Sequence, residues 1–459
     1  MAGPTAFRSR DGAYPYDRYM TDVMPQQETI SLEDFRTPEQ EMAELGAEVA
    51  PAADLAIEDV NPLNAHLFRD HRWHDYFARL RAEDPVHLNE IETAGRFWSI
   101  TKYDDVKAVD GDWQNFSSAE GITLGVKIGS AIPDRISNAS AFIAMDPPEQ
   151  TQQRKTVRGI SAPSSLRNLE DQIRERTVKV LDDLPEGETF DWVDTVSIEL
   201  TTILLAALFD FPFEDRRKLT RWSDIVFAIP EPGGIVESHE QRQTEMLEMV
   251  QYFDRLWDER RKNPGFDLVS MLANGEATKD MPTLEHLGNL LLLIVGGNDT
   301  TRNTMSGSIY GLNKFPEQYD KLIADPGLIP KMVPEIIRWQ TPLSYMRRTA
   351  TQDVELGGKQ ILKDDQLLMW YVSANRDEDM FGANANDIDI ERDNADRHLS
   401  FGYGVHFCMG SRLAELQLRI LWEELLGRFE RVEVVGEPER TFSSFVNGYQ
   451  HLPVQVKRK

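Results

Sequence analysis

Apolar residues recur at helical spacing through the middle of the chain, with polar residues between them. This period is typical of amphipathic or buried helices. It predicts helices at residues 149–160, 165–184, 191–209, 215–228, 240–262 and 283–314, and a last one at 410–429. Prolines and glycines at residues 230–234 interrupt the pattern and predict the tip of a flexible lid.

Strand patterns are few and short. A helix is expected at residues 65–82, and two alternating segments follow at 86–91 and 96–101. The turn residues between them favour a hairpin. Another strand is expected at residues 369–372. The predicted fold class is therefore mainly α with small β-sheets, an α+β chain.

The N-terminal region differs from the rest in composition. Residues 1–58 are polar, acidic and rich in proline, which predicts a loosely ordered arm with one short helix at 37–45. Residues 59–459 contain no linker or composition break, so a single domain is expected. Within it, residues 113–143 form a Gly/Ser-rich segment, and loops of that length are usually functional or disordered.

Charge and cysteine content exclude several classes of protein. A net charge of −27 opposes binding to nucleic acid and to anionic membranes. The longest apolar run, around residues 290–295, is too short to span a bilayer, and no signal peptide is evident. A single cysteine excludes an intramolecular disulfide, a four-cysteine zinc site and an iron–sulfur cluster. We expect a soluble, cytoplasmic protein.

The single cysteine, Cys408, lies in the segment FGYGVHFCMG at residues 401–410. Gly404 and Gly410 allow the backbone to approach a flat group closely. A helix follows, and its N-terminus favours the thiolate that ligates a metal. Haem iron held by one cysteine is the best match among metal sites. The alternative is a buried structural cysteine in a glycine-rich turn.

Two adjacent glycines interrupt the predicted helix at residues 283–314. Glycine inside a helix costs about 1 kcal/mol relative to alanine, and close approach of a ligand is a common reason for it. Thr300 can donate to a carbonyl of the preceding turn and open a small pocket for dioxygen. Asp299 beside it can relay protons. The alternative is a helix end, with the Gly-Gly-Asn-Asp sequence capping the next helix.

The cysteine segment resembles the haem-binding signature of the cytochrome P450 superfamily, the haem-thiolate monooxygenases. It matches Phe-x-x-Gly-x-His-x-Cys-x-Gly at Phe401, Gly404, His406, Cys408 and Gly410. The resemblance covers roughly residues 60–455. It implies a triangular helical prism that encloses haem b (iron protoporphyrin IX), with Cys408 as the iron ligand.

The same resemblance assigns further roles. Asp299 and Thr300 occupy the acid and alcohol positions of the family's oxygen-activation motif. The residues expected to contact haem are Gln150, Arg154, Gly297, Thr301, Arg348, Phe401, Gly402, His406 and Gly410. Arg154, Arg348 and His406 are expected at the propionates, whereas Gln150 stands where many relatives have histidine. Glu335, Arg338 and Arg392 correspond to a structural ion-pair cluster.

Residues 292–303, 335–343, 375–378 and 412–417 resemble the bacterial terminal hydroxylases of alkanes and fatty acids. This implies insertion of one atom of O2 into the end of a medium-chain alkane, fatty acid or related linear chain. Expected pocket walls are Ile294, Gly297, Leu343, Ser344 and the loop 122–143. Hydroxylation of a terpene or another compact hydrophobe is the alternative substrate class. A haem-based sensor or carrier is the non-enzymatic one, but it needs no Asp299–Thr300 proton relay.

Electrons are expected from a separate ferredoxin and its reductase, because the sequence shows no flavin or iron–sulfur domain. An acidic ferredoxin needs a local basic patch on this acidic chain. The residues predicted to form that patch are Arg154, Lys155, Arg158, Arg412 and Arg419. Phe407 departs from those relatives, which often carry arginine there, so a positive charge beside the thiolate is absent.

Overall fold

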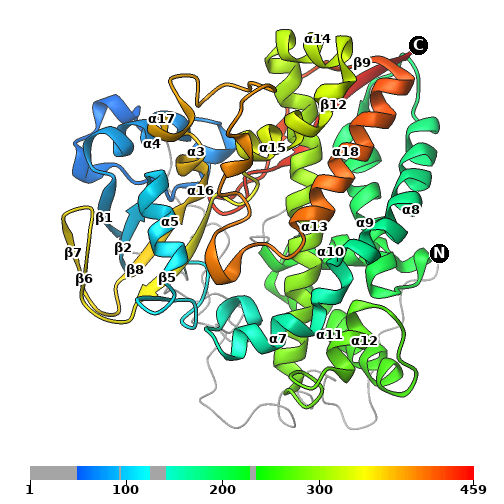
Figure 1. Cartoon of the computed structure of the whole chain (residues 1–459), viewed down its shortest axis with the longest axis horizontal. Helices are drawn as coiled ribbons and strands as arrows, with labels where there is room; N and C mark the ends of the chain where they lie inside the picture. Colours follow the sequence, from blue (N-terminus) through cyan, green and yellow to red (C-terminus); the bar gives the residue numbers. More distant parts are fainter. Residues whose placement is uncertain (1–48, 92–94, 125–140, 228–233) are drawn as a thin grey trace.

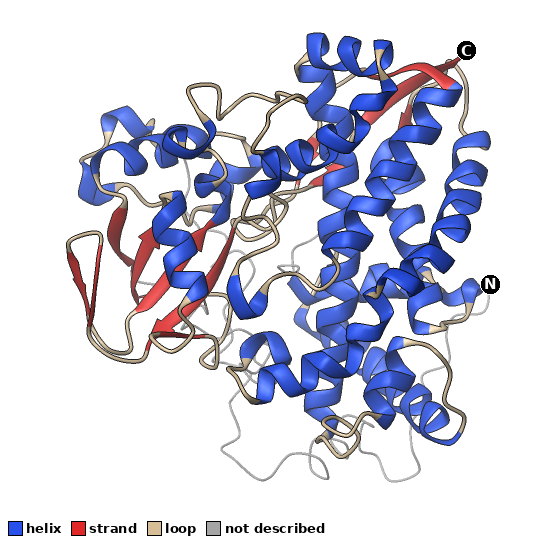
Figure 2. Ribbon diagram, viewed as in Figure 1, coloured by secondary structure: helices blue, strands red, loops and turns tan. Residues whose placement is uncertain are grey.

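The computed structural model describes residues 49–91, 95–124, 141–227 and 234–459. A large helical part lies beside a smaller part that contains most of the strands (Figures 1 and 2). The predicted fold class, mainly α with small sheets, is confirmed. The expected helix at 37–45 and almost all of the expected lid tip at 230–234 lie outside the described residues.

The helical part is arranged around α13 (Thr283–Lys314), whose bounds match the prediction. This helix contacts α9, α10 and α15, while α8 packs on α18 (Figure 1). The bounds of the surrounding helices are α7 Glu149–Val157, α8 Pro163–Asp182, α9 Glu199–Phe209, α10 Arg217–Phe227, α11 His239–Lys262, α12 Leu268–Asn274, α14 Pro316–Ala324, α15 Ile329–Gln340 and α18 Ser411–Arg428.

Other helical predictions need correction. The helix expected at 65–82 is divided into α3 (Ala65–Arg69) and α4 (Trp73–Glu83), because His71 between them has a left-handed φ of 55°. The helix expected at 191–209 begins as a π-helix at Val193–Ile198 before α9. The strand expected at 369–372 covers the end of one strand and the start of a helix. The sequence pattern also missed the short helices α5 Tyr103–Gly111, α12, α14, α16 Tyr371–Ala374 and α17 Glu378–Phe381.

The largest sheet has five strands in the order β1-β2-β8-β5-β3. Strand β2 runs parallel to β8, and the other neighbours are antiparallel. Its strands are β1 Val86–Ile91, β2 Gly95–Ile100, β3 Phe116–Ser117, β5 Tyr345–Ala350 and β8 Gln366–Trp370. The smaller sheets are β4-β12-β9 (Phe190–Asp191, Pro453–Arg458, Phe429–Val434), β10-β11 (Glu439–Arg440, Tyr449–His451) and β6-β7 (Val354–Leu356, Lys359–Ile361). The five-stranded sheet brings β5 and the end of β8 to the functional site.

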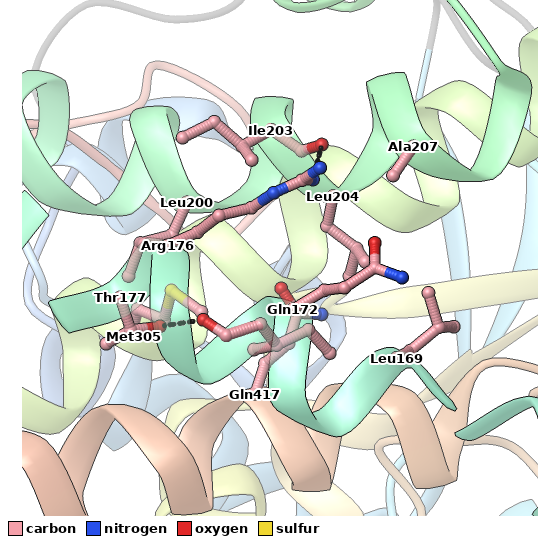
Figure 3. A pocket seen from close by; sticks show the side chains of 11 residues that line it. Leu169, Gln172, Arg176, Thr177, Leu200, Ile203, Leu204, Ala207, Met305 and Gln417 are labelled. Carbon is pink, nitrogen blue, oxygen red and sulfur yellow. Dashed lines mark hydrogen bonds between the residues drawn. The ribbon is translucent and has the colours of Figure 1, made fainter. Parts of the chain in front are cut away.

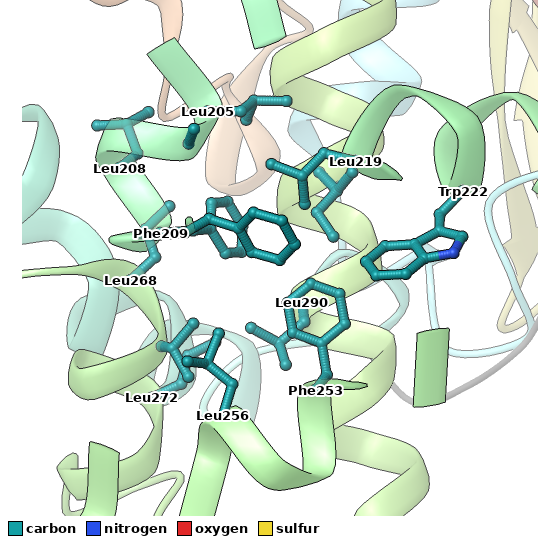
Figure 4. Packing of buried hydrophobic residues seen from close by; sticks show 14 of the residues in the cluster. Leu205, Leu208, Phe209, Leu219, Trp222, Phe253, Leu256, Leu268, Leu272 and Leu290 are labelled. Carbon is teal, nitrogen blue, oxygen red and sulfur yellow. The ribbon is translucent and has the colours of Figure 1, made fainter. Parts of the chain in front are cut away.

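The core of the helical part is packed from long apolar side chains on α9 to α13. Phe209, Leu219, Trp222, Phe253 and Leu290 are almost fully buried and pack together (Figure 4). Burial of each such side chain stabilises the fold by roughly 1.5–3 kcal/mol. This packing fixes α9 and α13 relative to each other, and these two helices form one side of the site.

The described end of the predicted arm is packed on the domain. The Tyr76 hydroxyl donates to the Ala50 carbonyl at 2.6 Å, and Arg79 donates to the Ala52 and Leu55 carbonyls at 2.5 and 2.6 Å. Ala52 itself is buried. Residues 49–58 therefore contact the domain, because Val49, Ala52, Leu55 and Ile57 pack on its apolar cluster.

Candidate active site

A cavity of about 250 Å³ lies between α13, α9, the start of α18 and the segment 401–410, called the cysteine loop. Most of the predicted cofactor residues line it. They are Arg154, Gly297, Thr301, Arg348, Phe401, Gly402, His406 and Gly410, together with Cys408 and Thr300. The structure thus brings these residues from four distant stretches of the sequence to one cavity.

Cys408 is held by the backbone of the cysteine loop. Its N–H donates to the Phe401 carbonyl at 2.7 Å, and the N–H groups of Gly410 and Ser411 point to its sulfur. Gly404 has a φ of 70°, and a Cβ there would meet the Asp110 carbonyl oxygen at 2.9 Å. Only glycine therefore permits this close approach between the loop and α5.

The helix N-terminus does not by itself make Cys408 a thiolate. Burial raises the pKa of the thiol, and the N–H groups of Gly410 and Ser411 with the charge of Arg154 oppose this increase incompletely. The expectation that the helix N-terminus alone favours the Cys408 thiolate is therefore corrected. Coordination to a metal cation deprotonates a thiol outright and so is the stronger influence.

Two predicted propionate ligands lie at the rim of the cavity. His406 is half-buried, and desolvation with the charges of Arg348 and Arg154 lowers its pKa to about 3, so its imidazole is neutral. Its Nε2 lies 3.1 Å from the Ser118 hydroxyl. Arg154 donates to the Phe407 carbonyl and lines the cavity. A neutral histidine still supplies one N–H donor.

Gln150 is placed differently from the prediction. Its side chain is 1% exposed, does not line the cavity and donates to the Val405 carbonyl at 2.8 Å. The side-chain amide of Gln150 reaches the backbone of the cysteine loop and forms its hydrogen bond there. Gln150 therefore braces the cysteine loop against α7 and makes no direct approach to the cavity.

Arg348 has a partner that the sequence interpretation missed. Its Nη2 donates to Oδ1 of Asp110 at 2.7 Å, and both side chains are buried. Oδ2 of Asp110 accepts from the Tyr371 hydroxyl at 2.8 Å and from the Tyr403 N–H at 2.7 Å. Asp110 lies on the same helical stripe as the buried Tyr103 and Val106. If residues 103–111 are recognised as a helix, an acid on this otherwise apolar stripe is the sequence signal that could have identified Asp110.

On the opposite side of the cavity, α13 presents Gly296, Gly297 and Thr300. A Cβ at Gly296 would meet nothing within 4 Å, so this backbone faces open space. The Thr300 hydroxyl donates to the Gly296 carbonyl at 2.8 Å, the bond expected from the sequence. This geometry leaves a flat glycine backbone surface and the Thr300 hydroxyl toward the cavity, and Thr301 and Thr304 of the same helix also line it.

Asp299 does not line the cavity. Its carboxylate pairs with Arg302 at 2.9 Å, and Arg302 also pairs with Asp224 of α10 at 2.9 Å. Burial raises the pKa of Asp299 to about 6, although Arg302 acts in the opposite direction. The Asn298 amide donates to the same carboxylate at 3.2 Å. Asp299 is therefore linked to the outer surface of α10 through a buried chain of charges.

The apolar walls agree only in part with the expected set. Gly297 and Leu343 line the cavity, whereas Ile294 and Ser344 do not. Ile294 is turned into the helical core by the 100° step between successive helical residues, and the Ser344 N–H is bound to the Phe445 carbonyl at 2.8 Å. Phe142 and Ile143, at the end of the expected loop 122–143, line the cavity as predicted. The wall residues that sequence reasoning missed include Leu204, Leu205, Leu208, Leu292, Leu293 and Met346. Of the expected loop wall 122–143, residues 125–140 lie outside the described ranges.

A second, much smaller cavity lies between α8, α9 and α18 (Figure 3). Leu204 and Gln417 line both cavities, so these two side chains separate them. Arg176 closes one end through a hydrogen bond of 3.0 Å to the Ile203 carbonyl. The small cavity holds space for about one water molecule and is not a second substrate site.

The predicted structural ion pairs are assembled behind the cysteine loop. Arg338 makes two bonds of 2.7 Å to the Glu335 carboxylate, and Arg392 approaches the same carboxylate at 3.2 Å. Glu335 and Arg338 are fully buried. Arg338 also donates to the Asn375, Ala385 and Asp387 carbonyls. This cluster fixes α15 to the segment that leads into the loop.

The expected basic patch is smaller than predicted. Lys155, Arg158 and Arg412 are exposed. Arg154 is turned inward, and Arg419 is neutralised by Glu170 at 2.7 Å and Glu423 at 3.3 Å. Arg419 is thus removed from the patch, because Glu170 of α8 and Glu423 of its own helix α18 pair with it. The cysteine loop adds two exposed aromatic rings here, Tyr403 at 42% and Phe407 at 44% exposure.

The residues around the cavity match the needs of a haem group. A sulfur ligand lies on one side, a glycine surface on the other, and arginines with an imidazole at the rim match two propionates. Among the described residues, no cluster of three or more possible metal ligands occurs. The fold and the site define a haem-thiolate protein.

Comparison with known proteins gives the family. Residues 327–456 match the family described as Cytochrome P450. Linalool 8-monooxygenase from Pseudomonas putida is 35% identical over 402 residues, which cover 86% of this chain and 98% of that protein. Methyl-branched lipid omega-hydroxylase from Mycobacterium bovis is 32% identical over 391 residues, covering 82% and 90%. The structure of CYP153D17 from Sphingomonas sp. PAMC 26605 is 49% identical with a TM-score of 0.79, covering 87% and 99%.

The chain belongs to the cytochrome P450 family and is a haem-dependent monooxygenase that uses O2 on a hydrophobic substrate. Its cofactor is haem bound through a cysteine thiolate, and the sequence contains only one cysteine, Cys408. Across the described residues, no helix is long and apolar enough to cross a membrane.

Proposed function

We propose that this cytochrome P450 hydroxylates the end of a linear apolar chain, such as a medium-chain alkane, a fatty acid or a related molecule. The observation that carries the proposal is the composition of the cavity wall. Leucines from α9 and α13 form the side away from the cysteine loop, and the charged lining residues Asp110, Arg154 and Arg348 lie on the loop side. An apolar wall of this kind suits an alkyl chain and offers it no hydrogen bonds.

The name of one similar protein and a set of sequence segments support the same direction. The relative from Mycobacterium bovis is an omega-hydroxylase of methyl-branched lipids. The sequence segments that resemble alkane and fatty-acid hydroxylases include residues 292–303, which contribute the leucine and glycine wall. Together these observations favour attack at a chain end.

When bound, haem supplies the activation of O2 and the oxidation of the C–H bond. The polypeptide determines where that chemistry acts. Because a methyl C–H bond is stronger than a methylene C–H bond, selectivity for the end depends on positioning. Leu205, Leu293 and Leu343 bind and orient the chain and exclude water. Thr300 holds a proton at its hydroxyl on the cavity side, and Asp299 is the acid that can exchange protons with it.

Around the haem, Cys408 is the iron ligand, and Arg348, Arg154 and His406 are the partners of the propionates. Electrons come from a ferredoxin with its reductase. The surface for it consists of Lys155, Arg158 and Arg412, together with the exposed ring of Phe407. The aromatic ring replaces a charge at this place, so contact there depends more on apolar burial.

A compact terpenoid is a second candidate substrate, because a protein named linalool 8-monooxygenase is 35% identical to this chain. The two classes differ in shape. A linear chain needs a long narrow wall, whereas a compact molecule needs width near Gly296 and Leu205. The comparison of substrates must therefore include both.

The test uses the haem-loaded protein and a panel of octane, decane, decanoic acid and linalool. Substrate binding is followed by the shift of the haem absorption band, and product regiochemistry is determined by gas chromatography with mass spectrometry. The proposal requires linear chains to give the larger shift and products oxidised at the terminal carbon. Tighter binding of linalool, or mainly subterminal products from linear chains, contradicts it.

Two neighbouring residues provide a matched pair of variants. Leu293 lines the cavity and Ile294 packs in the core. Leu293→Val is expected to alter the ratio of terminal to subterminal product several-fold. Ile294→Val removes a methylene of the same size and should leave that ratio unchanged. Equal effects of both variants would show that the assigned wall is incorrect.

A further inference from the structure

Asp110 is an unusual residue for its position. It stands in the last turn of α5, where the carbonyl ends of the helix disfavour a negative charge. Its side chain is nevertheless 2% exposed and lines the haem cavity. A carboxylate in such a place needs strong compensation, since burial of an unpaired charge is very unfavourable.

The compensation comes from three donors on three different elements. Arg348 of β5 donates at 2.7 Å, the Tyr371 hydroxyl at the start of α16 at 2.8 Å, and the Tyr403 N–H of the cysteine loop at 2.7 Å. The bond to Tyr403 holds the backbone five residues before Cys408. One carboxylate therefore connects the thiolate loop with the arginine at the rim.

Arg348 retains donors for another partner. Among the described residues its guanidinium donates through Nη2 to Asp110 and through Nη1 to the Arg347 carbonyl at 2.8 Å. A guanidinium has five N–H donors in a rigid plane, so the bonds to Asp110 and Arg347 fix the direction of the remaining three. Because Arg348 lines the cavity, these donors are available to a haem propionate.

We propose that Asp110 is a positioning residue of the haem site, which orients Arg348 for a propionate, anchors the cysteine loop and lowers the reduction potential of the iron by its negative charge. This role does not depend on the substrate class. It rests on the family's haem and on the three contacts of one buried carboxylate.

The charge is tested with Asp110→Asn in the haem-loaded protein. Removal of a buried negative charge favours the ferrous state, so the potential should rise. The expected shift is about tenfold in the ferric–ferrous equilibrium, which is 59 mV for one electron. Asp104→Asn is the matched control, because Asp104 is an exposed acid on the same helix, and it should change the equilibrium less than twofold. Spectroelectrochemistry measures both, and an unchanged potential in Asp110→Asn overturns the charge assignment.

Positioning is tested by haem transfer to excess apomyoglobin. Asp110→Asn and Arg348→Gln are each expected to accelerate haem loss about tenfold. If Asp110 acts through Arg348, the double variant should lose haem no more than about threefold faster than either single one. Independent, multiplicative effects would refute the positioning role, and Asp110→Glu should restore most of the retention.

If Asp110→Asn does not fold, Tyr371→Phe tests the proposal instead. This change removes one donor from the Asp110 carboxylate and leaves its charge less neutralised. The reduction potential of the iron should therefore fall, by an amount that corresponds to a two- to five-fold change in the ferric–ferrous equilibrium. An unchanged potential in this variant would show that the iron does not sense the Asp110 charge. Substrate binding and product regiochemistry, which test the proposed function, are measured separately and need not change.

Discussion

Asp299 and Thr300 are consecutive residues of α13, but only the Thr300 side chain faces the haem cavity, while the Asp299 carboxylate is bound to Arg302 at 2.9 Å. The acid must therefore exchange this partner, or use water, to deliver a proton to the hydroxyl. Arg302 also forms an ion pair with Asp224, whose side chain is 23% exposed. The pair is arranged as a relay that begins at the surface of α10.

Replacement of Asp299 by asparagine is expected to slow proton delivery. The amide keeps the size of the side chain but cannot supply a proton, and general acid–base groups contribute about 10²–10⁴-fold. We expect a decrease in turnover of about 100-fold and a larger solvent isotope effect on it. The absorption shift on substrate binding should not change, because Asp299 does not line the cavity. A normal turnover rate would remove Asp299 from the relay.

Asp299 also gives the folded protein a defined pH dependence. Burial raises its pKa to about 6, above the value of the unfolded chain, so the native state binds a proton more tightly between about pH 4 and 6. Stability from this group is present below pH 4 and is lost as the pH rises through 6. Relative to the Asp299→Asn variant, the free energy of unfolding of the wild type should decrease by up to roughly 3 kcal/mol across this pH window. Urea denaturation at several pH values measures the difference, and a constant difference contradicts the assignment.

Thr300→Ala is expected to uncouple O2 consumption from product formation. The variant loses the Thr300 hydroxyl on the cavity face, together with its 2.8 Å bond to the Gly296 carbonyl. The fraction of consumed O2 recovered as product should fall several-fold, with peroxide released in its place. Thr300→Ser keeps the hydroxyl and should remain coupled. Intact coupling in Thr300→Ala would show that the hydroxyl does not control the proton.

Sequence reasoning located the parts of the site that depend on local chemistry. The cysteine loop, the glycine interruption of α13 and the cluster of Glu335, Arg338 and Arg392 each carry residue types that few other roles require. Their spacing was enough to place them. The long helix at 283–314 was equally clear from its apolar period.

Other features depend on which face an element presents after packing. Ile294 and Leu293 are both apolar, and only the orientation of α13 decides that Leu293 forms the wall. Arg419 is neutralised by Glu170, which is almost 250 residues away in the sequence. Asp110 gains its role from Arg348 and Tyr403, also distant in sequence. Such pairings arise from tertiary contacts that one sequence does not encode in a local pattern.

Glu335→Gln should strongly destabilise the fold. The change leaves the buried guanidinium of Arg338 and the nearby Arg392 without their carboxylate, and loss of one partner of a buried ion pair costs roughly 3–5 kcal/mol. Glu391→Gln is the control, because Glu391 forms an exposed pair of 2.8 Å with Lys321, worth about 1 kcal/mol or less. Denaturant titration of both variants gives the comparison. Similar small losses would mean that backbone carbonyls alone satisfy Arg338.

Charge reversal at Arg158 and Arg412 should weaken reduction by a ferredoxin while sparing turnover driven by peroxide. Both residues are exposed near the cysteine loop, so each substitution to Glu adds repulsion toward an acidic partner without touching the cavity. The KM for a bacterial [2Fe–2S] ferredoxin should rise about tenfold per reversal and depend less on ionic strength. Lys457→Glu, an equal change on β12 at the far end of the molecule, should leave the KM unchanged (Figure 1). Equal loss of ferredoxin-driven and peroxide-driven turnover would show damage to the haem site and would contradict the assignment of this surface.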